Sequence, residues 1–347
     1  MPKLSKEYQF LDLSDYGRST AILIAKSLKD SKLTPIHVTI LFTISGLLAV
    51  FFILQGYYLA AGVFLILKSI LDAADGELSR VKDTPSYTGR YLDSISDIIL
   101  NFLIITAIGY KSNISFVYSF LAFLGIQFQG TLYNFYYVIL RNNSTEGDDT
   151  SRILETKAPK AFIGESQRTV NLLFNVFRFL YGLFDNIIYS LDKSASQIKN
   201  FPNWFMTLVS LYGLGFQLII ISIMLNLGLI DYIIPFFIYY SVLIVLIVAI
   251  RKYFISSSRH NYKLIKDWKK INLQQQPQHK LNKQVLNIKE TFTTAPDELN
   301  FFSLKELNKK NYDVTDLEAG RKYVAAHVQH SNKFITFINE KTKNDMH

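Results

Sequence analysis

The sequence contains no cysteine. This absence excludes disulfide bonds and thiolate chemistry, and it leaves every other class of function open. A secretory signal peptide is also lacking, because the one early apolar patch, Ala21 to Ala25, is too short for such a segment and is flanked by charged residues. We therefore expect no cleaved leader.

Charged residues are scarce over long stretches of the chain. Hydrophobic residues make up 49% of the sequence and charged residues 19%, which is unusual for a soluble enzyme and concentrates the apolar residues in blocks. Uncharged runs long enough to cross about 30 Å of hydrocarbon as helices lie at residues 36–54, 113–140, 204–230 and 232–250. Residues 57–74 and 89–110 are two further apolar segments that contain charged side chains. The pattern predicts an all-α integral membrane protein with a six-transmembrane-helix bundle.

Lysine and arginine are almost absent from one side of this predicted topology. If the N-terminus is cytoplasmic, 35 of the 37 basic residues fall on the cytoplasmic side, Lys111 falls outside and Lys68 lies within a span. Cations are retained on the cytoplasmic side of short loops. We therefore expect both termini to be cytoplasmic.

Two pairs of aspartates flank a short polar turn between two of the predicted spans. Asp72 and Asp75 are three residues apart, and Asp93 and Asp97 are four apart, so each pair shares a helix face. An unpaired aspartate at the centre of a membrane helix costs about 2.5 to 3.5 kcal/mol, so four of them require the interface or a compensating cation. A fifth aspartate, Asp83, is predicted to belong only to the turn.

Oxygen ligands favour a hard divalent cation such as Mg²⁺ or Mn²⁺ over zinc. Four carboxylates provide ligands for two such ions. Gly76 permits close approach of a ligand, and the guanidinium of Arg80, one turn further on, suits a phosphate or pyrophosphate. Together these features predict phosphoryl transfer or cleavage at a membrane surface.

The aspartates also form part of a longer pattern. Asp72-x-x-Asp75-Gly76-x-x-Ser79-Arg80, eight residues, then Gly89-x-x-x-Asp93-x-x-x-Asp97 resembles the signature of the CDP-alcohol phosphotransferase (CDP-alcohol phosphatidyltransferase) family. Seven of the eight signature positions agree, and Ser79 stands where the family has alanine. Residues 33–39, LTPIHVT, also look like the family's Thr-Pro-Asn-x-Val-Thr at the start of its first membrane helix, with Ile36 in place of the asparagine.

The resemblance implies a reaction and a set of residue roles. The family transfers a substituted phosphate from a CDP-alcohol to an acceptor hydroxyl and releases CMP. By resemblance, two ions of Mg²⁺ or Mn²⁺ are bound by Asp72, Asp75, Asp93 and Asp97. Asp97 is also implied to be the catalytic general base for the acceptor hydroxyl. The residues implied to lie against the CDP moiety are Gly76, Ser79, Arg80 and Gly89.

The substrates follow only by analogy with the family's compact bacterial and archaeal members. That analogy favours CDP-diacylglycerol as donor and a small polyol, amino alcohol or sugar phosphate as acceptor, in phospholipid biosynthesis in a bacterial cytoplasmic membrane. The alternative within the family is a CDP-aminoalcohol:diacylglycerol phosphotransferase. A homodimer is a further candidate assembly.

Several polar residues are candidates for contacts to the acceptor. Lys68 is one turn before Asp72, so it either pairs with that carboxylate, which we favour, or binds substrate phosphate. Arg90 and Arg141 are candidate ligands of an acceptor phosphate, although cations at such positions commonly serve topology alone. A group of polar side chains between residues 127 and 137 has two possible roles: it lines a headgroup pocket or, as we favour, it forms an interfacial belt. The group comprises Gln127, Gln129, Tyr133, Asn134, Tyr136 and Tyr137.

The sequence divides into a membrane domain at residues 36–254 and two flanking segments. Residues 1–35 are a cytoplasmic segment with an interfacial helix, and residues 255–347 are a basic cytoplasmic tail. A cytoplasmic insert at residues 141–203 has helical apolar spacing that predicts a second interfacial amphipathic helix, with packing of that helix against the bundle as the alternative. Residues 251–290 hold ten basic and two acidic residues, which favours anionic membrane lipid, and not nucleic acid, as a partner.

Two other classes of function compete with the transferase. A cation-conducting transporter or channel would place the aspartates near the bilayer midplane, whereas these lie beside a cytoplasmic turn. An inactive scaffold with the same fold would lack one of the aspartates, and none is missing.

Overall fold

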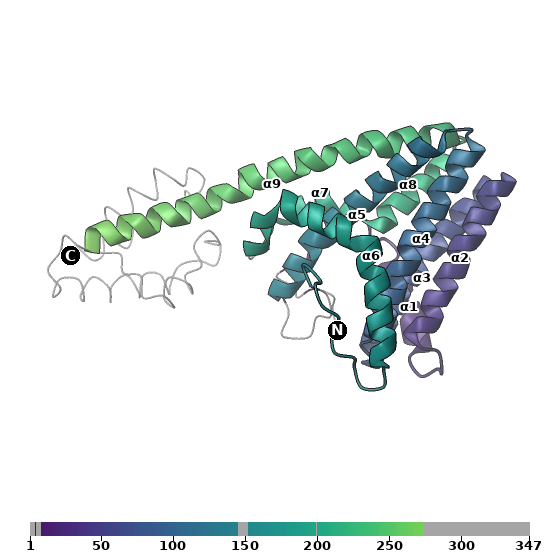
Figure 1. The fold of residues 1–347 in the computed structure, drawn as a ribbon, viewed down its shortest axis with the longest axis horizontal. Coiled ribbons are helices and arrows are strands. Elements are labelled where there is room, and N and C mark those ends of the chain that lie inside the picture. Colours follow the sequence, from purple (N-terminus) through teal and green to yellow (C-terminus); the bar gives the residue numbers. More distant parts are fainter. Residues whose placement is uncertain (1–3, 5–7, 145–151, 199, 274–347) are drawn as a thin grey trace. The chain divides into compact units, whose positions relative to one another are not determined.

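The structure is a computed structural model that describes residues 4, 8–144, 152–198 and 200–273. Every regular element in these residues is a helix (Figure 1). The helices are α1 (Arg18–Leu28), α2 (Pro35–Gln55), α3 (Tyr58–Lys82), α4 (Tyr87–Lys111), α5 (Phe116–Ser144), α6 (Gln167–Leu191), the short 3-10 helix η2 (Lys193–Gln197), α7 (Asn203–Ser210), α8 (Leu214–Asn226) and α9 (Ile230–Leu273). The chain divides into two compact units, Met1–Ala249 and Ile250–His347.

Four of the described helices carry the features expected of membrane spans. The helices long and apolar enough to cross a membrane are α2, α4, α6 and residues 230–254 of α9, and the bent pair α7 and α8 adds a fifth span if it crosses as one. These helices agree with a multi-pass membrane protein. The predicted count of six spans is not confirmed, because α3 carries Lys68, Asp72 and Asp75 along its 25 residues and is not among them, and neither is α5.

The helices α2, α3 and α4 run side by side, and small residues allow their close packing (Figure 1). A Cβ atom added to Gly46 of α2 would lie 2.6 Å from Leu100 of α4, and one added to Gly62 of α3 would lie 2.4 Å from Asn226 of α8. Small residues that bring backbones together are the usual means of packing helices in membranes. This packing fixes α3 and α4, the two helices that carry the aspartates.

Local sequence explains the reversal between α3 and α4. Asp83 ends α3 in a left-handed conformation with φ of 52°, and Ser86 begins α4 as its N-cap, with its hydroxyl accepting a hydrogen bond from the Gly89 N–H at 2.8 Å. Aspartate tolerates the left-handed region better than most residues, and serine is a preferred N-cap. The two helices therefore form the hairpin that the sequence predicts, with Asp83 in its turn.

The insert folds as a helix against the membrane bundle. One side of α6 buries Val170, Phe174, Phe184 and Ile188, while Phe179 and Leu183 are exposed. Glu165, just before α6, binds the first turn of α4, and Asp192, just after it, accepts a hydrogen bond from Tyr136 of α5. Helix α6 thus packs against α4 and α5, which is the alternative to the predicted interfacial placement, and it is also long and apolar enough to cross a membrane. The interfacial placement stays a prediction.

The segments outside the membrane domain are described only in part. The predicted N-terminal interfacial helix corresponds to α1. Helix α9 continues to Leu273, through the predicted boundary at residue 254. Most of the predicted basic tail, residues 274–347, lies outside the described residues.

Candidate active site

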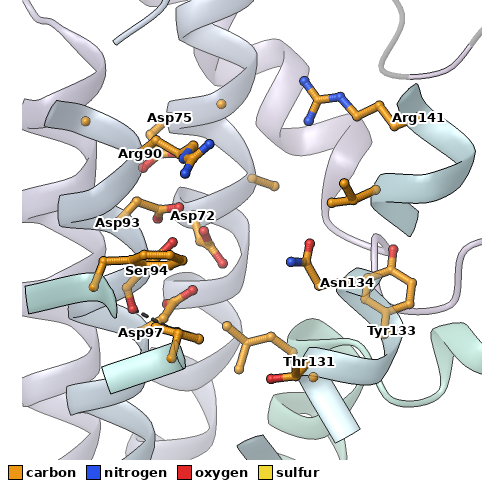
Figure 2. A pocket seen from close by; sticks show the side chains of 18 of the residues that line it. Asp72, Asp75, Arg90, Asp93, Ser94, Asp97, Thr131, Tyr133, Asn134 and Arg141 are labelled. Atoms are coloured by element: carbon orange, nitrogen blue, oxygen red, sulfur yellow. Dashed lines mark hydrogen bonds between the residues drawn. The ribbon is translucent and has the colours of Figure 1, made fainter. Parts of the chain in front are cut away.

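A cavity of about 1790 Å³ opens beside the hairpin of α3 and α4. Its walls are built from α3, α4, α5 and α6, with contributions from the segment before α1 and from the loop before α6. Figure 2 shows the aspartates on one side of this cavity, facing Thr131, Asn134 and Arg141 of α5 on the other. All eight signature residues that the sequence singled out line this one cavity.

Three of the four aspartates form a cluster. Carboxylate oxygens of Asp72, Asp75 and Asp93, one from each, lie within 4.8 Å of one another. The spacing of three residues places Asp72 and Asp75 on one face of α3, and Asp93 lies in the second turn of α4. Asp97, the fourth predicted ligand, is not part of this cluster.

The cluster has the chemistry of a divalent cation site. The Asp75 carboxylate accepts one hydrogen bond from the Thr39 hydroxyl at 2.7 Å, whereas the buried Oδ1 atom of Asp93 has no hydrogen-bond partner among the described residues. A buried carboxylate oxygen without a partner is costly, and a hard cation is the ligand that three carboxylates favour. The residues present therefore fit Mg²⁺ or Mn²⁺.

Asp97 lies beside a buried lysine. The Lys68 ammonium pairs with the Asp97 carboxylate and lies 3.8 Å from Asp72 Oδ2 and 5.0 Å from the centre of the Phe42 ring. Lys68 is fully buried and does not line the cavity. The Lys68 ammonium is thus within ion-pair distance of Asp72, the partner that the sequence favours, but its nearer partner is Asp97.

The predicted CDP-binding residues lie along one rim of the cavity. A Cβ atom added to Gly76 would meet only the Arg80 guanidinium, at 3.7 Å, so this face of α3 is open. Arg80 pairs with Glu77 at 2.7 Å, and Glu77 also pairs with Arg18 of α1 at 2.9 Å. The Ser79 hydroxyl near the end of α3 donates to the Thr84 carbonyl of the turn at 3.0 Å.

Arg90 and Arg141 line the cavity from different helices. Arg90 of α4 pairs with Glu155 of the loop before α6, and its guanidinium lies 4.6 Å from the centre of the Tyr91 ring. The Tyr91 hydroxyl donates to the same Glu155 carboxylate at 2.7 Å. Arg141 lies near the end of α5, across the cavity from the aspartates (Figure 2).

Part of the chain that lines this cavity is similar to a known protein family. Residues 32–161 match the family model described as CDP-alcohol phosphatidyltransferase. This part of the chain is thus similar to a CDP-alcohol phosphatidyltransferase domain. The match confirms the resemblance predicted from the signature, and it covers α2 to α5 and Glu155. No curated protein and no solved structure matches the chain.

Beyond the matched residues, the start of α4 is held by an acidic residue that sequence patterns do not reveal. Glu165 accepts hydrogen bonds from the Thr88 N–H at 2.8 Å, from the Tyr87 N–H at 3.2 Å and from the Ser86 hydroxyl at 2.8 Å. Burial raises the pKa of Glu165, but these hydrogen bonds outweigh burial and hold the pKa below its ordinary value. A carboxylate from the insert therefore caps the helix that carries Asp93 and Asp97.

The polar residues of α5 separate into two groups. Gln127, Thr131, Tyr133 and Asn134 line the cavity, whereas Gln129, Tyr136 and Tyr137 do not. The Tyr136 hydroxyl donates instead to Asp192, and Gln129 bonds to other helices. The lining of the cavity by Gln127, Tyr133 and Asn134 agrees with the headgroup-pocket alternative, and the favoured interfacial belt stays a prediction.

Proposed function

We propose that the protein transfers a phosphatidyl group from CDP-diacylglycerol to the hydroxyl group of a small alcohol and releases CMP, in phospholipid biosynthesis. One observation carries the proposal. Within the family-matched residues, Asp72, Asp75 and Asp93 bring carboxylate oxygens within 4.8 Å of one another beside a cavity that Arg80 also lines. A pyrophosphate needs both cationic neutralisation and a group that binds its oxygens, and this arrangement supplies both.

The clustered aspartates would hold the divalent cation. Bound there, Mg²⁺ or Mn²⁺ supplies positive charge that neutralises the pyrophosphate. The open face at Gly76 admits the cytidine diphosphate, beside the Arg80 guanidinium that pairs with Glu77. The binding of two ions by four aspartates, with Asp97 as the fourth, stays a prediction.

Asp97 is the proposed base. The acceptor oxygen forms a bond to the phosphorus that carries the diacylglycerol group, the bond from that phosphorus to the CMP oxygen breaks, and the acceptor's proton passes to the Asp97 carboxylate. The Lys68 ammonium pairs with the Asp97 carboxylate and so compensates its negative charge. Arg90 and Arg141, which line the cavity, are proposed to contact the phosphate of an acceptor that carries one.

The topology proposed from the basic residues places this site at the cytoplasmic surface. The cavity lies at the hairpin end of α3 and α4, which is the end assigned to the cytoplasm, and a water-soluble acceptor and CMP can exchange there. Anionic lipid around the basic tail and a homodimer remain further proposals.

The direct test follows CMP release by the purified protein in detergent or nanodiscs. Reactions contain Mg²⁺ or Mn²⁺, CDP-diacylglycerol and one acceptor each from a panel of glycerol, glycerol 3-phosphate, myo-inositol, inositol 1-phosphate, serine and ethanolamine. We expect CMP release with one acceptor class, and its loss in Asp97→Asn and with excess EDTA. Release only with CDP-ethanolamine and diacylglycerol would establish the alternative reaction. Release no higher than that of Asp97→Asn under every condition would reject transferase function.

A further inference from the structure

Two polar atoms on α5 are buried without a hydrogen-bond partner among the described residues. They are Nε2 of Gln127 and Oγ1 of Thr131, and their residues are only 4% and 5% exposed. The two residues are four apart, one above the other on the same face of α5. Both residues line the cavity of the proposed active site.

The neighbouring glutamine shows what a satisfied amide looks like in this helix. Gln129 is fully buried and does not line the cavity, and its Nε2 donates to the Ser241 hydroxyl at 2.9 Å while its Oε1 accepts from Gln217 at 3.0 Å. In a helix bundle without water, a polar group that lacks a partner is costly. The orphaned atoms of Gln127 and Thr131 are therefore accounted for best by a ligand in the cavity.

The position of the two residues indicates which substrate they face. Figure 2 shows Thr131 on the α5 side of the cavity, across from Asp72, Asp93 and Asp97. A substrate between these two walls would present its reacting hydroxyl to Asp97 and the rest of its headgroup to α5. Arg141 is ten residues further along α5, about 15 Å from Thr131 at the rise of an α-helix, so the two polar groups are separate from the arginine that could bind a phosphate.

We propose that Gln127 and Thr131 bind hydroxyl groups of the acceptor headgroup and select a polyol as acceptor. The proposal rests on the proposed function. An amide N–H donates, and a threonine hydroxyl both donates and accepts, so both suit an uncharged hydroxyl group, which can take either role. An acceptor whose only hydroxyl is the reacting one would leave both groups unpaired, and a site built for hydroxyl groups rejects such analogues.

The test compares side chains of similar shape in the full-length protein. Thr131→Val and Gln127→Met remove the polar groups, Thr131→Ser keeps the hydroxyl, and Thr43→Val is a matched control. The Thr43 hydroxyl donates to the Thr39 carbonyl of its own helix at 2.8 Å, and Thr43 does not line the cavity. For a polyol acceptor used by the wild type, we expect Thr131→Val and Gln127→Met each to raise the acceptor KM about five- to tenfold. The KM for CDP-diacylglycerol should change less than about twofold, and Thr131→Ser and Thr43→Val should resemble the wild type.

The outcomes separate this inference from the proposed function. If the wild-type protein releases no CMP with any donor or acceptor, the proposed function fails. If it releases CMP but the acceptor KM is unchanged in both variants, or the donor KM rises in its place, the inference fails and the proposed function stands. Use of acceptors with a single hydroxyl alone, such as ethanolamine and serine, likewise overturns the inference.

Discussion

The electrostatic balance of the site depends on one residue, Lys68. Its buried ammonium pairs with Asp97 and lies 3.8 Å from Asp72, so it compensates charge at the junction of the cation cluster and the proposed base. Removal of one partner of a buried ion pair leaves an uncompensated charge, which costs about 3 to 5 kcal/mol, whereas replacement of both by neutral groups costs much less. Lys68 therefore has a structural role in addition to any effect on catalysis.

This role predicts a pattern in a double-variant cycle. Lys68→Met should lower the thermal unfolding temperature of the detergent-solubilised protein, because Asp97 is left buried without its partner. The double variant Lys68→Met with Asp97→Asn should recover most of the loss, since both charges are removed, while CMP release stays abolished. An unfolding temperature for Lys68→Met equal to that of the wild type would show that the pair does not stabilise the fold.

The aspartates should separate into cation ligands and a proton acceptor. Asp93 has a buried, unpartnered oxygen within the cluster, whereas Asp97 lies outside it, so Asp93→Asn should weaken Mn²⁺ binding more than Asp97→Asn does. We expect a rise in the Mn²⁺ dissociation constant of at least about tenfold for Asp93→Asn, because even residues that only orient metal ligands contribute about 10- to 100-fold. Electron paramagnetic resonance of free Mn²⁺ measures this binding without any turnover. Both variants should lose CMP release, and equal dissociation constants in the two would contradict the division of roles.

At the scale of the helix, the first turn of α4 depends on Glu165. Three donors from Ser86, Tyr87 and Thr88 bind this carboxylate, which also compensates the positive end of the helix dipole. The insert thereby orients the helix that presents Asp93 and Asp97 to the cavity. The effect belongs to the element, since Glu165 itself does not line the cavity.

The lowered pKa of Glu165 gives this cap a pH dependence. A carboxyl group whose pKa is lower in the folded than in the unfolded protein stabilises the fold above its ordinary value of 4.5, and that contribution is lost as the pH falls through the lowered pKa. Glu165→Gln should therefore lower the unfolding temperature at pH 7, as loss of a cap worth about 1 kcal/mol does. The difference from the wild type should shrink as the pH falls below about 4.5, which differential scanning fluorimetry across pH would show. A difference independent of pH would exclude the charge of Glu165 as the cause.

At the scale of the whole molecule, local patterns predicted the hairpin but not the contacts that close the site. Spacing on one helix placed Asp72 with Asp75, and a favourable turn residue marked Asp83, because both follow from helix geometry within a few residues. The partners Glu155 and Glu165 come from 65 to 79 residues away in the chain, and no periodicity identifies them. The same limit applies to Gln127, since the difference between it and the satisfied Gln129 depends on what α8 and α9 place beside α5.

The division of the chain into two units predicts which part is needed for activity. Every residue that lines the cavity belongs to the first unit, Met1–Ala249, and the last of them is Gln217. Truncation after residue 273 keeps all of these residues and the whole of α9, so the shortened protein should release CMP with a kcat within about twofold of the full chain's in detergent. The natural comparison is truncation after residue 229, which removes α9 and with it the Ser241 partner of Gln129, and which should unfold the bundle. If the protein truncated after residue 273 lost activity while its unfolding temperature stayed unchanged, the segment after residue 273 would have a direct part in the reaction.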